Sequence, residues 1–315
     1  MTPAAPYTAR REARSRFISV RGLRYHVLEW GEAESATPER PPLVLMHGWM
    51  DVGASFQFVV DALPTDRYCV ALDWRGFGLS DAPVTDTYWI PDYLGDLDVA
   101  LHVLFFDSPG APQKIDLLGH SLGGNAVMLY AGLRPERVRR LVNLEGFGMP
   151  ATTPAMAAKR YVQWFDQLRT PATLRPYPTL AAVAQRLRKT NPLLRADRAD
   201  WLAERWSKEL RHADGASLGW QILADPAHKG MSPTLYQVDE VLACWAQITA
   251  PVLWVEGDQT DTARWWGTRY TVAEFHSRLA TVKQVQRETL SPAGHMLHHD
   301  QPEALAALLE AFLAG

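Results

Sequence analysis

The stretch Ile115-Asp116-Leu117-Leu118-Gly119-His120-Ser121-Leu122-Gly123 places a G-x-S-x-G motif directly after a short apolar run. Such a run is typical of a buried strand, and residues 122–133 that follow have the pattern of a helix. Glycines on both sides of a serine allow a sharp turn, so that the hydroxyl projects toward the free amide groups of that helix. The motif alone is a common glycine-rich turn, but its position between a strand and a helix predicts that Ser121 is a nucleophile.

The pattern around this motif recurs along the chain. Apolar runs end in glycine or a carboxylate, and helix-like segments separate them, which predicts an α/β fold with a mostly parallel sheet covered by helices on both faces. We expect an N-terminal hairpin within residues 17–28 and a strand-like segment at 282–285. The other expected strands are 43–46, 68–72, 115–118, 138–144 and 252–255, and the expected helices are 56–63, 93–106, 122–133 and 302–313.

One long interval breaks this alternation. Residues 149–246 show no clear strand and are rich in Arg, Trp, Ala and Pro, with helical patterns at 155–168, 179–189 and 200–212. Because a stretch of this length is not a simple loop in a compact domain, we expect a helical cap at 149–246, inserted into a core formed by 17–148 and 247–315. Residues 1–16 carry four arginines and no apolar segment, so we expect a disordered tail and a cytoplasmic protein.

The composition excludes several classes of function. The 315 residues include 32 Lys and Arg against 35 Asp and Glu, a net charge of −3, which provides no basic field for nucleic acid. No apolar stretch approaches the ~20 residues that cross a bilayer. The two cysteines, Cys69 and Cys244, form neither a disulfide framework nor a CxxC metal pair. We therefore expect a small-molecule substrate, no membrane or nucleic-acid partner, and no cofactor; the oligomeric state stays open.

A serine hydroxyl needs a base to act as a nucleophile at neutral pH. His295, in Ser291-Pro292-Ala293-Gly294-His295 before the last expected helix, is the predicted base. His298, His299 and Asp300 follow closely, but their spacing matches no standard metal motif, so we expect no metal.

A carboxylate must hold the imidazole, and the residues offer three. Glu145 follows the apolar run 141–144, whereas Asp258 and Asp261 follow the run 252–255. The carboxyl ends of parallel strands share one edge of a sheet, so each is a candidate. The backbone N–H groups of Trp49 and Leu122 are the predicted oxyanion hole.

Two nearby segments have less direct roles. His47, which precedes Gly48 and Trp49, is expected to be a hydrogen-bonded structural residue. The turn-rich stretch 73–80 is expected to be a scaffold loop near the site.

Together these motifs and their order resemble the α/β-hydrolase superfamily from Phe17 to Leu313. The resemblance implies an eight-stranded sheet, a helical cap inserted after the sixth strand, and a site between cap and core. It is closest to the capped haloalkane dehalogenase-like branch, some of whose members place a catalytic Glu after the sixth strand. This implies Glu145 as the acid, since Thr260 stands where many other members carry Asp.

Two departures from the dehalogenases matter. Ser121 stands where they have an aspartate nucleophile, and Trp49 stands where they have a halide-binding Asn. Carbon–halogen cleavage is therefore not expected.

The leading prediction is a serine hydrolase that cleaves an ester, thioester or related acyl compound through an acyl-enzyme. The cap tryptophans suggest a largely apolar substrate. One alternative is carbon–carbon bond hydrolysis of diketone-type substrates by the same residues, with Arg160 or Arg186 holding a substrate carboxylate. The other is a non-catalytic ligand-binding protein of the same fold.

Overall fold

The main sheet has eight strands and is mostly parallel, as predicted. The computed structural model describes residues 5–64, 66–107 and 113–315. The strand order is β1-β2-β4-β3-β5-β6-β9-β10, with β1–β2 and β2–β4 antiparallel and the other pairs parallel. The strands are β1 (Arg14–Val20), β2 (Leu23–Trp30), β3 (Leu43–Met46), β4 (Cys69–Leu72), β5 (Ile115–His120), β6 (Val138–Leu144), β9 (Val252–Gly257) and β10 (Val285–Leu290).

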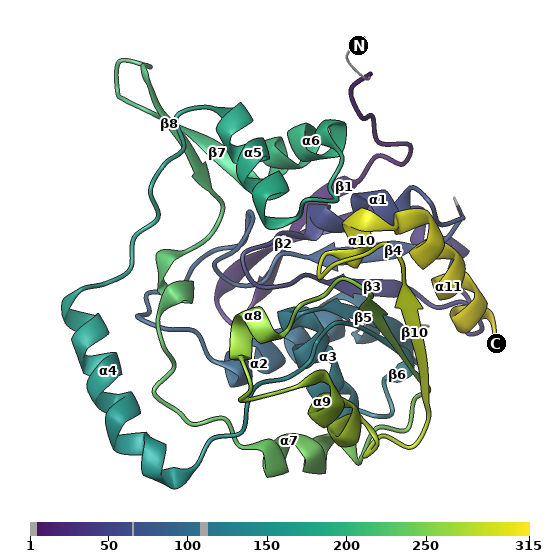
Figure 1. Ribbon diagram of the computed structural model, residues 1–315. Helices are drawn as coiled ribbons and strands as arrows, with labels where there is room; N and C mark the ends of the chain where they lie inside the picture. Colours follow the sequence, from purple (N-terminus) through teal and green to yellow (C-terminus); the bar gives the residue numbers. More distant parts are fainter. Residues whose placement is uncertain (1–4, 65, 108–112) are drawn as a thin grey trace.

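Helices cover both faces of this sheet (Figure 1). In β3, Val44 and Met46 belong to one core cluster, while Leu43 and Leu45 belong to the other, as a strand buried on both faces requires. The first cluster includes residues of α2 (Ile90–Leu101), α3 (Leu122–Leu133) and α9 (Val272–Leu279), and the second includes residues of α1 (Gln57–Val60) and α11 (Pro302–Ala314). The α/β class predicted from the apolar runs is therefore confirmed.

Three local predictions differ from the structure at element boundaries. Instead of the helix expected at 56–63, the chain forms a 3-10 turn at Gly53–Phe56 followed by the single helical turn α1. The helix expected at 93–106 is α2, which ends at Leu101 and is followed by a π-helical turn at His102–Phe106. The strand expected at 282–285 begins later, at Val285, and continues to Leu290 as β10. Its residues Gln286 to Glu288 are largely polar because β10 is an edge strand, and its register is set by pairing with β9.

The interval 149–246 contains helices and a β-hairpin (Figure 1). The helix expected at 200–212 ends at Trp206, where the chain continues as β7 and pairs with the next strand, β8. This hairpin pairing overrides the local helical pattern. The elements are α4 (Ala157–Arg169), α5 (Leu180–Thr190), α6 (Ala196–Trp206), β7 (Ser207–Arg211), β8 (Ser217–Ile222), a 3-10 turn at Pro226–Lys229 and α7 (Val238–Trp245).

Helix α7 packs on the core. A Cβ atom on Gly132 of α3 would lie 2.0 Å from the carbonyl oxygen of Cys244, and Trp245 is buried in the cluster that covers α3. This end of the interval therefore contributes to the helical layer that includes α3, on one face of the sheet.

The expectation of a disordered tail at 1–16 is wrong for its second half. Strand β1 begins at Arg14, and the buried guanidinium of Arg11 donates to the carbonyl oxygens of Val60, Pro64 and Arg67. These carbonyls lie between the end of α1 and the start of β4, so the arginine ties the N-terminal segment to this connection. Residues 1–4 lie outside the described residues. Within the described ranges, no helix is both long and apolar enough to cross a membrane.

Candidate active site

Ser121 occupies a strained turn between β5 and α3. Its φ is 53° and its ψ is −114°, a conformation that side chains seldom adopt and that costs about 1–3 kcal/mol. Its N–H donates to the carbonyl of Leu144 at 2.8 Å, and its own carbonyl accepts from Asn125 at 2.9 Å. These bonds fix the serine at the carboxyl edge of the sheet.

Glycine is required on both sides of the serine turn because backbone carbonyls lie too close for a Cβ atom. A Cβ on Gly119 would lie 2.3 Å from the carbonyl oxygen of Gly123, and a Cβ on Gly123 would lie 2.1 Å from the carbonyl oxygen of Met46. Neither glycine has a positive φ, so the serine itself adopts the unusual backbone geometry. The glycines let α3 start directly against β3 and β5.

The structure brings Ser121, His295 and Glu145 together. Nε2 of His295 lies 3.0 Å from Oγ of Ser121, and its Nδ1 lies 2.7 Å from Oε2 of Glu145. His295 comes from the loop between β10 and α10 (Leu297–Asp300), and Glu145 directly follows β6. The carboxylate is fully buried, whereas 26% of the His295 side chain is exposed, so the site opens to solvent at the imidazole.

The other two candidate acids lie away from the imidazole. Asp258 accepts hydrogen bonds from Oγ of Ser291 at 2.6 Å and from the N–H of Ala293 at 2.9 Å, which ties two loops together. Asp261 is exposed and accepts from the N–H of Ala263 at 3.0 Å. Of the three carboxylates left open by the residues alone, Glu145 is the one in contact with His295.

Two further groups hold Glu145. Its Oε1 accepts from the N–H of Gly257 at 2.7 Å and from the hydroxyl of Thr260 at 2.6 Å. The sequence reasoning missed this role of Thr260. The resemblance, which implies an acid at this position in many members of the superfamily, was the available signal that the side chain lies at the site.

Burial shifts the pKa values of both titratable partners. Desolvation raises the pKa of Glu145, and the two hydrogen bonds to Oε1 oppose that rise. Desolvation lowers the pKa of His295 to about 4, which keeps the imidazole neutral at pH 7. When the neutral imidazole carries its proton on Nδ1 and donates it to Glu145, Nε2 is free to accept a hydrogen bond from the hydroxyl of Ser121.

The loop Gly48-Trp49 lies beside the nucleophile. A Cβ on Gly48 would lie 3.2 Å from Cβ of Ser121. In the described part of the chain, the N–H groups of Trp49 and Leu122 donate to no protein acceptor. Leu122 is the first residue of α3, so its N–H belongs to the positive end of that helix.

His47 and Asp73 are structural, as expected. Nδ1 of His47 lies 2.7 Å from the carbonyl of Gly48, and Nε2 accepts from the N–H of Trp74 at 3.0 Å. Asp73 accepts from the N–H of Gly53 at 2.7 Å, and lies 2.7 Å from Nδ1 of His26. Both side chains hold the loops beneath the site.

Residues of the interval 149–246 contact the core beside this site. The indole of Trp49 donates to the carbonyl of His228 at 3.1 Å, and the indole of Trp206 donates to the carbonyl of Met50 at 3.0 Å. The ring of Trp265 lies 4.6 Å from that of His295. Among the cap arginines considered for substrate binding, Arg160 donates to the carbonyl of Ser232, and Arg186 to Thr190 of its own helix.

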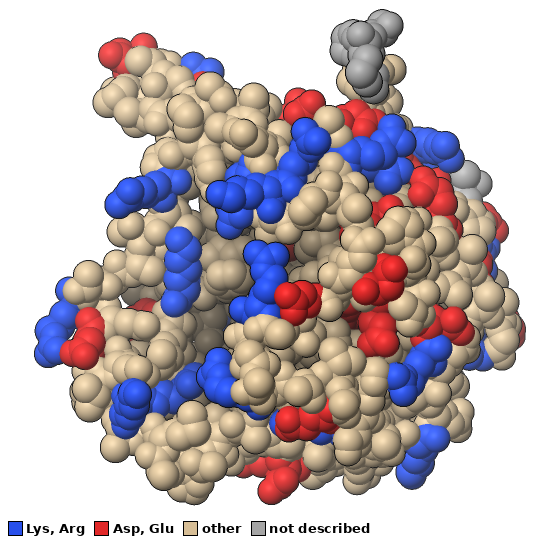
Figure 2. Space-filling model, viewed as in Figure 1, with Lys and Arg blue, Asp and Glu red and all other residues tan. Residues whose placement is uncertain are grey.

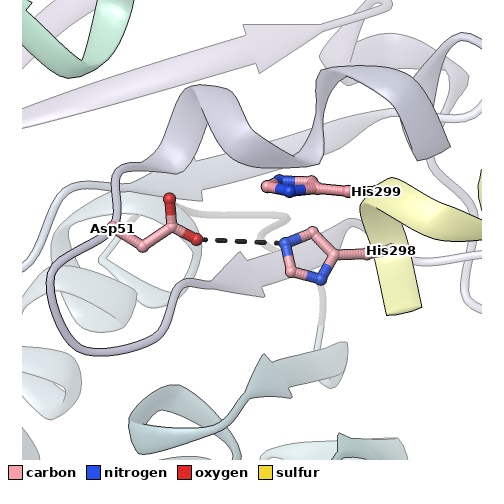
Figure 3. Close-up of side chains that lie close together, drawn as sticks. All are labelled: Asp51, His298 and His299. Carbon is pink, nitrogen blue, oxygen red and sulfur yellow. Dashed lines mark ion pairs between the residues drawn. The ribbon is translucent and has the colours of Figure 1, made fainter. Parts of the chain in front are cut away.

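Asp51, His298 and His299 form a buried cluster behind the site (Figure 3). It is the one group of described His, Cys, Asp and Glu residues whose ligand atoms are close enough for a metal ion. However, Oγ of Ser55 lies 3.1 Å from Nε2 of His298 and 2.5 Å from Nε2 of His299. A metal would lie about 2.0–2.1 Å from these nitrogens, and the hydroxyl of Ser55 already lies close to both of them. Oδ2 of Asp51 and Nδ1 of both histidines have no hydrogen-bond partner among the described residues.

Comparison with known proteins agrees with this architecture. The family model of the alpha/beta hydrolase fold matches residues 41–302. A serine hydrolase-like protein of Danio rerio is 26% identical over 299 residues, which cover 90% of this chain and 86% of that protein.

Solved structures show the same fold. A hypothetical protein of Pseudomonas aeruginosa PAO1 aligns with a TM-score of 0.79 at 24% identity, over 96% of this chain and 99% of the other. The thioesterase domain from the curacin biosynthetic pathway aligns with a TM-score of 0.74 at 24% identity, over 95% and 99%. The chain therefore belongs to the α/β-hydrolase fold family. Hydrolysis is the class of reaction that this membership supports.

Proposed function

We propose that the protein is a serine hydrolase that cleaves an ester or thioester through an acyl-enzyme. His295 takes the proton of Ser121 while Oγ attacks the carbonyl carbon, and the carbonyl oxygen becomes an oxyanion. When the tetrahedral intermediate collapses, the bond to the leaving group breaks and His295 gives its proton to that group. A water molecule, deprotonated by His295, then opens the acyl-enzyme, and Ser121 regains its proton.

The observation that carries this proposal is the chain of contacts from Oγ of Ser121 to Nε2 of His295 and from Nδ1 of His295 to Glu145, at 3.0 and 2.7 Å. Glu145 stabilises the imidazolium that forms when the serine loses its proton. The free N–H groups of Trp49 and Leu122 are the oxyanion donors, each worth roughly 3 kcal/mol in the transition state.

Exposed apolar side chains at the site favour an apolar acyl group. Trp49, in the oxyanion loop, is 53% exposed, and Trp265, against His295, is 42% exposed. Large apolar side chains left open at a site bind apolar ligand surface.

The test is turnover of p-nitrophenyl esters of increasing chain length, together with labelling by a fluorophosphonate. Ser121→Ala should abolish labelling and lower kcat by about four to six orders of magnitude. Ser277→Ala, which changes an exposed serine of α9, is the matched control and should behave as the wild type. Undiminished labelling or turnover of Ser121→Ala would overturn the proposal. Faster turnover of a carboxylate-bearing diketone than of any ester would assign carbon–carbon hydrolysis instead.

A further inference from the structure

The backbone N–H of Trp49, the proposed oxyanion donor, lies in a loop that is fixed on both sides. Its peptide unit also contains the carbonyl of Gly48, which accepts from Nδ1 of His47 at 2.7 Å. On the other side of Trp49, the carbonyl of Met50 accepts from Nε1 of Trp206 at 3.0 Å. The donor is therefore flanked by one carbonyl that a core imidazole holds and one that the indole of Trp206 holds.

Met50 adopts a backbone conformation that methionine seldom occupies. Its φ is 55°, in the left-handed region that favours glycine. Such a conformation persists only where surrounding contacts hold it, and the indole N–H of Trp206 is the partner of the Met50 carbonyl. Without that hydrogen bond, a return of Met50 to an ordinary φ would rotate the peptide that joins it to Trp49 and displace the Trp49 N–H.

Trp206 is itself held in place, since it is the last residue of α6 and packs against a buried apolar cluster. That cluster joins Val52, two residues after Met50, to Ala199 and Leu202 of α6. The indole is therefore presented to the loop by a helix that rests on the core.

Helix α6 differs in this respect from α4. The part of the interval 149–246 that carries α5 and α6 packs on the core, whereas the surface is hollowed between α4 and the core (Figure 1 and Figure 2). None of the residues of α4 is buried. Of these two helices, α6 is thus the one whose position against the core is fixed by packing.

A second hydrogen bond between the same loop and the interval runs in the opposite direction. Nε1 of Trp49 donates to the carbonyl of His228 at 3.1 Å. The ring of His228 is stacked between Phe77 and Tyr88, with its centroid 3.6 Å from that of each. This bond holds the side chain of Trp49, but that side chain is also exposed beside the nucleophile, where it would meet the substrate directly. Trp206 is therefore the better position for a test.

We propose that Trp206 is a positioning residue of the oxyanion hole. Its indole N–H holds Met50 in the left-handed conformation, and Met50 in turn keeps the N–H of Trp49 directed at the oxyanion that forms on the substrate. The interval 149–246 thereby contributes to the transition state through a hydrogen bond to the backbone of the loop. The inference rests on the proposed function and adds a requirement to it, namely that α6 must be docked for the oxyanion hole to be complete.

Two substitutions at position 206 separate the hydrogen bond from packing. Trp206→Phe keeps a large aromatic ring and removes the donor. Trp206→His removes much of the ring and keeps a donor, because Nε2 has the same place in the five-membered ring of histidine as Nε1 has in that of tryptophan. If Trp206 acts through its N–H, the phenylalanine variant is the more impaired of the two, whereas a packing role alone predicts the reverse.

The measurements are kcat and KM for p-nitrophenyl octanoate and the Ki of octyl trifluoromethyl ketone. Oγ of Ser121 adds to the carbonyl carbon of this ketone, its proton passes to His295, and the carbonyl oxygen becomes an oxyanion. Trp206→Phe should lower kcat about tenfold with KM within about twofold, since loss of a whole oxyanion donor lowers kcat about 10²–10³-fold and this change only displaces one. The Ki should rise by about the factor by which kcat/KM falls. Trp206→His should stay within about threefold of the wild type in kcat and Ki.

The matched control is Trp201→Phe, which changes a tryptophan of the same helix whose ring packs against Tyr7 and Phe58. It should leave kcat, KM and Ki within about twofold of the wild type. Reaction of each preparation to completion with a fluorophosphonate gives the concentration of active sites, so that a loss of folded protein does not enter kcat.

The outcomes separate this inference from the proposed function. A phenylalanine variant with wild-type kcat and Ki, or a histidine variant more impaired than the phenylalanine variant, would overturn the inference. A fall in kcat without a parallel rise in Ki would also overturn it, because the oxyanion contact would then be intact. Ester hydrolysis that still depends on Ser121 would in each case leave the proposed function standing.

Discussion

The hydroxyl of Thr260 lies 2.6 Å from Oε1 of Glu145 and donates to it, from a turn after β9 to a carboxylate after β6. The opposite oxygen, Oε2, faces Nδ1 of His295 at 2.7 Å. Thr260 therefore orients, from the turn after β9, an acid that the neighbouring strand β6 supplies.

Glu145→Gln should lower kcat by about three to four orders of magnitude, because an amide presents the imidazole with the wrong hydrogen-bond partner and no charge. Asp261→Asn, which changes an exposed carboxylate on a nearby loop, is the control and should lower kcat less than about threefold. Steady-state kinetics on a p-nitrophenyl ester measure both variants. The reverse ranking would transfer the role of the acid to the loop after β9.

Thr260→Val should lower kcat about tenfold, since a hydrogen bond to a charged group contributes about 1.5–3 kcal/mol. Thr260→Ser keeps the hydroxyl and should recover most of the activity. The pH profile tests whether the effect passes through Glu145: without the donor on Oε1, the carboxylate stabilises a protonated His295 more strongly, so the acid limb of kcat/KM, which His295 sets, should move to higher pH in the valine variant. An unchanged acid limb would indicate a packing effect alone.

The acid limb of kcat/KM in the wild-type protein should lie below pH 6.5. Desolvation lowers the pKa of His295 from 6.5 to about 4, and the imidazole loses its basic lone pair only when pH falls through that pKa. Activity should therefore persist at pH values where an ordinary histidine is protonated. A stopped-assay pH series between pH 4 and pH 8, with stability checked by circular dichroism at each pH, measures it. A midpoint at or above 6.5 would contradict the expected desolvation.

Ser55→Ala should destabilise the fold by about 2–4 kcal/mol, because two buried imidazole nitrogens, of His298 and His299, lose their shared partner. Urea unfolding at neutral pH measures the change, and Ser277→Ala, at an exposed position of α9, should change stability by less than about 0.5 kcal/mol. Chelator treatment should leave the unfolding midpoint of the wild type unchanged. A chelator-dependent loss of stability would instead assign a metal to the Asp51 cluster (Figure 3).

Much of the core could be predicted because its pattern is local. Strands such as Leu43–Met46 and Val138–Leu144 are continuous apolar runs, which burial on both faces requires, and α3 follows the serine motif at the expected residues. The edge strand β10 was misplaced for the same reason, since its exposed residues break the apolar run.

The hairpin β7–β8 and the docking of Arg11 were not predicted because both depend on contacts outside the segment itself. For β7 the contact is the neighbouring strand β8, and for Arg11 it is a set of carbonyls far away in the chain. Ser207 to Arg211 follow a helix without an obvious break and become a strand by pairing with residues 217–222. The sequence predicts that Arg11 belongs to a charged tail. In the structure its guanidinium is buried against backbone carbonyls that lie 49 to 56 residues further along the chain.

The sequence by itself determined the α/β class, the nucleophile candidate Ser121 and the base candidate His295, because a turn motif and an apolar strand are written in consecutive residues. The residues themselves left Glu145, Asp258 and Asp261 open, since all three follow strands that end at one edge of the sheet, and the tertiary structure shows which of them contacts His295. Only the registers of β6, β9 and β10 and the paths of their loops set which carboxylate is 2.7 Å from the imidazole. The same registers bring Thr260 to Glu145, across 115 residues of sequence.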